Sequence, residues 1–147
     1  MPAAGGSAVR ELAAKYGFVA QTPAEAVQAA LSGARTRTRA DAGARTRADG
    51  ADGAEAFLNE LAHRVAVGVA SVCVVLDSGL VVLGGEVGRA GGTVLADRVA
   101  AAVASIWPSR PRVVPTGVPG EPVLRGAMLA AIAQARAGLL ASVADPQ

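Results

Sequence analysis

The sequence has one cysteine and one histidine among its 147 residues. A single cysteine excludes a disulfide within the chain and a zinc site built from cysteines. A metal site needs several convergent ligands, and neither Cys73 nor His63 has suitable neighbours at ligand spacing. We therefore expect no metal site, with Cys73 a buried, inert thiol and His63 a solvated residue on a helix.

Aromatic residues are equally scarce, at 3% of the sequence, although 52% of the residues are hydrophobic. The predicted core consists of Ala, Val and Leu, and it offers few rings on which bases or sugars can stack. The formal net charge is only +2. A balance this close to neutral indicates neither nucleic acid nor an acidic substrate as a partner.

The sequence also lacks an uninterrupted apolar run long enough to cross a membrane. Between Val65 and Gly85 only Asp77 is charged, but a charge just past the middle costs about 2.5–3.5 kcal/mol on insertion. Residues 2–6 show neither the basic start nor the apolar stretch of a secretory signal. We expect a cytoplasmic protein that does not bind a membrane.

Residues 33–53 differ from the rest of the chain because they contain no Leu, Ile, Val or aromatic residue. The sequence GARTR at residues 33–37 repeats at residues 43–47, and five arginines fall between residues 35 and 47. A segment with so little apolar surface predicts a disordered insertion. The alternative is a basic arm for nucleic acid, but the interleaved aspartates and the absence of aromatic residues favour the insertion.

The preceding segment, residues 1–32, shows two short helical patterns. The second pattern opens with Thr22-Pro23-Ala24-Glu25, which supplies a capping residue, proline at the first helical position and glutamate at the third. No polar cluster converges in this segment. Its predicted role is therefore to support the fold.

A long helical pattern covers residues 54–77, with its polar residues confined to the first half. The second half, Val65–Leu76, is apolar on every side, which predicts a buried helix that ends at Asp77-Ser78-Gly79. Three further elements are predicted after residue 92. They are a helix at Thr93–Ile106, a short strand near a sheet edge at Arg112–Val114 and a last helix at Val123–Val143.

The most informative stretch lies between these helices. Leu80–Leu83 is a short apolar run typical of a buried strand, and Gly84, Gly85 and Glu86 begin a glycine-rich turn that continues to Gly92. Glycines after a strand let the backbone approach a ligand, and the N-terminus of a following helix can bind phosphate. The turn has neither the G-x-G-x-x-G order nor the Lys-Ser or Lys-Thr pair of a P-loop, so close packing is the alternative explanation.

Together these pieces resemble a known family. Residues 81–85 read VVLGG, residues 111–115 read PRVVP and residues 123–127 read VLRGA, an order similar to the C-terminal part of ROK proteins. These are sugar kinases and sugar-responsive repressors with an actin-like ATPase fold. The resemblance covers residues 54–143, and it implies that Gly84, Gly85 and Glu86 lie on the adenosine side of a nucleotide site.

Several features of the family cannot be placed in this sequence. It offers no D-x-G-x-T phosphate loop, no catalytic Asp after an Asn, no zinc site of one His and three Cys, and no winged helix-turn-helix. The resemblance therefore implies a non-catalytic C-terminal segment of a sugar-responsive regulator. One alternative is the nucleotide-side lobe of a sugar kinase without its catalytic half, and another is a structural or dimerisation fragment. No cofactor is expected for this chain, since ATP or ADP and a sugar ligand belong to full-length relatives.

These arguments predict an α/β fold, the C-terminal part of an actin-like ATPase (ribonuclease H-like) domain with the order helix-strand-helix-strand-helix. The expected regions are a helical segment at residues 1–32, the insertion at residues 33–53 and the α/β lobe at residues 54–147. The two predicted strands do not make an independently stable sheet. We therefore expect a homo-oligomer that covers its open strand edge and its apolar helix faces.

Overall fold

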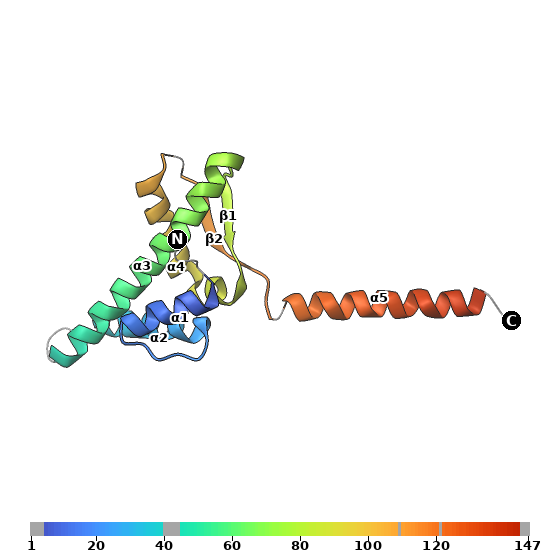
Figure 1. Cartoon of the computed structure of the whole chain (residues 1–147), viewed down its shortest axis with the longest axis horizontal. Helices are drawn as coiled ribbons and strands as arrows, with labels where there is room; N and C mark the ends of the chain where they lie inside the picture. Colours follow the sequence, from blue (N-terminus) through green and yellow to red (C-terminus); the bar gives the residue numbers. More distant parts are fainter. Residues whose placement is uncertain (1–4, 40–44, 109, 121, 145–147) are drawn as a thin grey trace. The chain divides into compact units, whose positions relative to one another are not determined.

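The computed structural model describes residues 5–39, 45–108, 110–120 and 122–144, which divide into a unit ending at Thr116 and a second unit that begins at Gly117. The elements in chain order are α1 (Gly6–Lys15), α2 (Pro23–Arg39), α3 (Arg45–Leu76), β1 (Leu80–Leu83), α4 (Gly85–Ile106), β2 (Arg112–Pro115) and α5 (Pro122–Ala144). Figure 1 labels them along the chain.

The predicted α/β fold is wrong. The chain is 76% helical, and the described residues hold five helices and a two-stranded sheet, which is not an actin-like ATPase arrangement. The physical reason is the alanine-rich composition, because alanine has the highest intrinsic helix propensity. Among the described residues, strands form only at two short runs that each contain a Val-Val pair, and the β-branched valine favours the pleated backbone.

The start of α2 is the predicted capping box. The Thr22 hydroxyl accepts a hydrogen bond from the Glu25 backbone N–H at 3.1 Å. The Glu25 carboxylate accepts bonds from the backbone N–H groups of Gln21 at 2.9 Å and Thr22 at 3.3 Å. These reciprocal bonds satisfy backbone donors that a helix start leaves without intrahelical partners.

Helix also occupies both ends of the predicted insertion, since α2 runs to Arg39 and α3 begins at Arg45. Residues 40–44 lie outside the described residues. The low apolar content of this stretch does not prevent helix, because helix needs no long-range partner for its backbone hydrogen bonds. The mobility that we predict for residues 33–53 as a whole stays a prediction.

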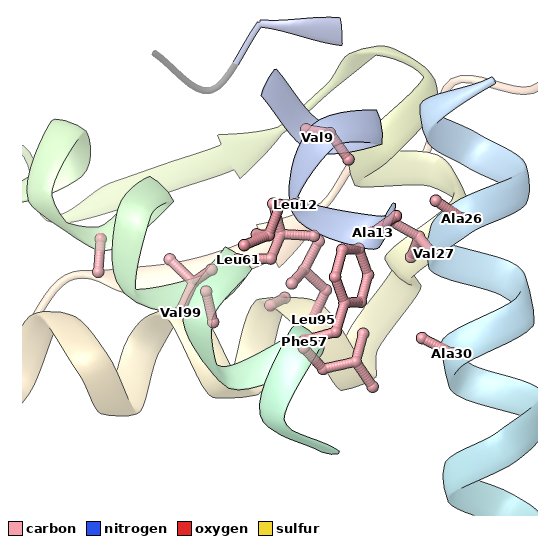
Figure 2. Packing of buried hydrophobic residues seen from close by; sticks show 14 of the residues in the cluster. Val9, Leu12, Ala13, Ala26, Val27, Ala30, Phe57, Leu61, Leu95 and Val99 are labelled. Carbon is pink, nitrogen blue, oxygen red and sulfur yellow. The ribbon is translucent and has the colours of Figure 1, made fainter. Parts of the chain in front are cut away.

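The core of the first unit lies where α1, α2, α3 and α4 meet. Figure 2 shows Phe57 and Leu61 of α3 beside Leu12 and Ala13 of α1, with Leu95 of α4 among them. The Phe57 ring lies 6.4 Å from the ring of Tyr16 and 5.8 Å from that of Phe18, measured between centroids. Most of the chain's few aromatic rings thus meet at one point of the core, where each buries a large apolar area.

The two parts of α3 on either side of Val65 differ in burial, and here a second prediction is wrong; we call residues 45–64 the first half and Val65–Leu76 the second half. The first half buries Phe57, Leu58 and Leu61. In the second half Val72 is 51% exposed, Val75 78% and Leu76 67%, and burial is limited to Ala66, Ala70 and Cys73. An apolar helix is buried only where other elements cover it, and the described elements leave this end of α3 partly uncovered.

The sheet pairs β1 and β2 in parallel, with Leu80 opposite Arg112 and Leu83 opposite Pro115. Both strands lie where the sequence predicts them, but the predicted burial of β1 is wrong: Leu80 and Val82 are 55% and 54% exposed, because no described element covers them. The connection between them is α4, which packs against both strands and begins directly after β1 at Gly85, so the predicted start of this helix at Thr93 is wrong. The glycines of residues 85–91 do not prevent helix, because its backbone hydrogen bonds need no side chain. This crossover places the glycine turn at the carboxyl end of β1.

Candidate functional site

The glycine turn at residues 84–86 is the site that the sequence predicts. Gly84 is the N-cap of α4 with extended backbone, and Gly85 opens the helix with a φ of +69°. That left-handed φ explains a glycine at position 85, because a side chain there is strained. Glu86 follows in the first turn of α4. The structure therefore brings all three predicted residues to one helix N-terminus.

The next glycines of the turn are explained by packing. A Cβ added at Gly88 lies 2.5 Å from the Leu83 carbonyl oxygen, and one added at Gly91 lies 2.5 Å from the Leu95 side chain. Gly92 has a φ of +52° and marks a kink inside α4. Close approach of α4 to β1, and then a change of helix direction, account for these three positions.

Among the described hollows, the one whose lining residues are nearest to this turn in sequence lies at the beginning of β1. It has a volume of about 310 Å³ and lies between the second half of α3 and β1; we call it the α3–β1 groove. Its lining residues are Gly68, Val69, Val72, Ser78, Leu80 and Val81. None of them carries a charge, so the groove suits an apolar occupant rather than an ionic ligand.

A second hollow, of about 220 Å³, lies among α2, α3 and α4. At its rim the Arg98 guanidinium donates to Asn59 Oδ1 at 2.6 Å and contacts Glu55 Oε2 at 2.8 Å. The helical pattern puts Arg98 on the solvent-facing side of its helix. It does not reveal the partners of Arg98, since Asn59 lies 39 residues away. The cluster joins two helices, and its three polar groups satisfy one another.

Cys73 is buried, with its Sγ 3.9 Å from the carbonyl oxygen of Ser78, and His63 is exposed on α3. Both placements agree with the sequence-based expectation. Within the described part of the chain, no three His, Cys, Asp or Glu side chains gather as a potential metal site.

Two helical stretches, Asp52–Leu76 and Pro122–Leu140, are long and apolar enough to cross a membrane by length and composition alone. The most apolar window of the first stretch is 33% buried, and that of the second is not buried at all. The second stretch carries Arg125 and Arg136, whose charges oppose insertion. Length and composition therefore do not assign either stretch to a bilayer.

Comparison of the chain with protein-family models, curated proteins and solved structures finds no match. The function of the chain is therefore inferred from its described residues and its sequence motifs. These residues provide an uncovered apolar groove, an incomplete sheet and a glycine turn shaped by packing. Such an arrangement is suited to association with another polypeptide.

Proposed function

We propose that this chain is a non-catalytic segment, similar to the C-terminal part of a ROK-type sugar-responsive regulator. Its role is to associate with another polypeptide. The observation that carries the proposal is the close approach of α4 to β1 at Gly88. The glycines that resemble a nucleotide-binding turn are already required by the fold at positions 85, 88, 91 and 92. No ligand is needed to explain them.

The charge at the turn supports the same proposal. Glu86 lies in the first turn of α4, where a carboxylate interacts favourably with the helix dipole. A phosphate at this helix N-terminus has to approach that carboxylate, and like charges repel each other. A negative side chain of the chain itself thus lies in the same helix turn as the position that most resembles a phosphate site.

Calorimetry with ADP tests the proposal, with the unmodified chain compared with Gly84→Val. Gly84 has extended backbone, and a Cβ added there meets nothing within 4 Å, so valine keeps the fold while covering the turn. We expect no saturable heat with either protein. Saturable ADP binding by the unmodified chain that Gly84→Val abolishes, with unchanged circular dichroism, contradicts the proposal.

A coupled kinase assay with glucose, mannose and N-acetylated sugars tests the catalytic alternative. Phosphoryl transfer needs a base that orients the sugar hydroxyl and groups that hold metal-bound phosphates. We expect no turnover. Turnover that disappears in Asp77→Asn identifies the chain as part of a kinase. The DNA upstream of this reading frame separates regulator from kinase independently, because a helix-turn-helix followed by a zinc motif indicates the regulator and a D-x-G-x-T segment the kinase.

A further inference from the structure

The hollow of about 220 Å³ among α2, α3 and α4 combines apolar walls with charged groups of both signs. Its lining divides evenly into apolar residues, which are Leu31, Ala34 and Val94, and charged residues, which are Arg35, Glu55 and Arg98. Leu31 and Ala34 also pack against the hydrophobic core, which holds two of the apolar walls in place. Pockets for drug-sized ligands measure about 300–1,000 Å³, so this hollow suits a smaller molecule.

The negative charge of the hollow is held in position by contacts between α3 and α4. Arg98 donates to Asn59 Oδ1 at 2.6 Å and contacts Glu55 Oε2 at 2.8 Å. The side chains of Arg98 and Glu55 are only 24% and 32% exposed, so the ion pair is partly sheltered from water. An ionised carboxylate has two acceptor oxygens, and the contact with Arg98 uses one of them. Glu55 can therefore accept a further hydrogen bond from a cationic group in the hollow.

The α2 side of the hollow contributes a positive charge. The Arg35 Nε donates to the Leu31 carbonyl oxygen at 3.2 Å, which lays the side chain along its own helix. Among the described residues, no acidic group pairs with Arg35. Two arginines and one glutamate give the lining a net charge of +1. The two terminal nitrogens of Arg35 can thus donate to a carboxylate, in the paired geometry that a guanidinium favours.

We propose that this hollow binds a small aliphatic α-amino acid in its zwitterionic form. The ligand carboxylate pairs with the Arg35 guanidinium, and the ligand ammonium group donates to Glu55. The aliphatic side chain of the ligand lies against the apolar walls, which removes apolar surface from water. Each of the three chemical features of the ligand thus meets one part of the lining. This inference goes beyond the associating role proposed above and does not depend on it.

Other classes of ligand match less of the lining. Inorganic phosphate offers nothing to the apolar walls, and the Glu55 carboxylate repels it. A sugar is suited to an aromatic surface, and no aromatic residue lines the hollow. A simple carboxylate uses Arg35 without Glu55, and a simple amine uses Glu55 without Arg35. Only a molecule with both charges and an apolar body uses the whole lining.

Calorimetry of the full chain with L-leucine tests the ligand class. Isocaproate is leucine without its amino group, and isoamylamine is leucine without its carboxylate. We expect saturable heat with leucine at millimolar concentration. Either analogue should bind at least tenfold more weakly, because each loses one charge-assisted contact. Absence of saturable heat with leucine, or an analogue that binds as tightly as leucine, overturns the proposal.

Charge variants with matched controls test the location. We expect Arg35→Gln and Glu55→Gln each to weaken leucine binding at least tenfold, since glutamine keeps the helix propensity but removes the charge. The controls are Arg10→Gln and Glu11→Gln, which make the same changes at exposed positions of α1 and should leave the affinity unchanged. Leucine binding that survives both changes in the hollow overturns the proposal.

A third variant fills the hollow without changing a charge. Val94 is 45% exposed, and phenylalanine and valine have similar helix propensities, so Val94→Phe adds volume to the lining while α4 is kept. We expect at least tenfold weaker leucine binding with unchanged circular dichroism. Unchanged affinity places leucine elsewhere and overturns the proposal. ADP binding at the glycine turn is a separate result, which contradicts the proposed function and leaves the leucine site intact.

Discussion

The two halves of α3 lie in opposite surroundings. The first half places Phe57, Leu58 and Leu61 against three other helices, where each is at most 1% exposed. The second half presents Val72, Val75 and Leu76 to solvent, although it is the more apolar of the two. Burial therefore follows from the elements packed alongside a helix, and hydrophobic composition alone does not determine it.

The largest effect that separates the two halves is expected from truncating their side chains. Phe57→Ala removes a fully buried ring that contacts Tyr16 and Phe18, and we expect it to lower the free energy of unfolding by about 3–5 kcal/mol. Val75→Ala is the matched control, with an expected change within about 0.5 kcal/mol because its side chain is 78% exposed. Urea denaturation followed by circular dichroism measures both. Equal losses would show that both halves are covered in solution.

The next-largest effect is expected where α4 approaches β1 closely, at Gly88. Gly88→Ala forces a methyl group against the backbone carbonyl of Leu83, so we expect a loss of about 1–3 kcal/mol in the free energy of unfolding. Gly84→Ala, in the same turn but with open space, should cost less than about 1 kcal/mol. Thermal denaturation compares the two. A neutral Gly88→Ala would mean that β1 and α4 lie farther apart than described.

Helix α2 covers part of the first half of α3, and its stability is tested at its N-terminal capping box. Thr22→Ala removes the hydroxyl that accepts the Glu25 N–H, and we expect a loss of about 1 kcal/mol in the free energy of unfolding. Gln28→Ala is the control, because Gln28 is exposed within the same helix and alanine favours helix. Urea denaturation of both variants measures the difference. Identical stabilities would indicate that α2 does not need its capping box.

The smallest expected effect is the ion pair between Arg98 and Glu55, which links α4 to the first half of α3. Both side chains are partly exposed, so a double-mutant cycle with Arg98→Ala and Glu55→Ala should give a coupling of about 0.2–1 kcal/mol. The coupling should shrink at 1 M salt, since exposed charges are screened. A coupling that salt does not change would assign the interaction to the Asn59 hydrogen bond or to packing.

Prediction from the sequence succeeded where the signal is local. The capping residues at Thr22 and Glu25, the strand at Leu80–Leu83 and the buried thiol of Cys73 are all confirmed. Each depends on neighbouring residues or on a short apolar run. The burial of the second half of α3 could not be predicted this way, because it depends on which elements lie alongside it. The Arg98 cluster was hidden for the same reason, since its partners are distant in sequence.

By itself the sequence determined most of the helical segments and the positions of the two short strands, because these follow from propensity and periodicity, although α4 begins at Gly85 and not at the predicted Thr93. Only the tertiary structure decided that α4 connects two parallel strands and that Gly88 leaves space for the Leu83 carbonyl. It also decided that one half of α3 is covered and the other is not. The physical reason is that packing depends on contacts between residues far apart in the chain, and a periodic pattern shows which face is apolar without showing what will cover it.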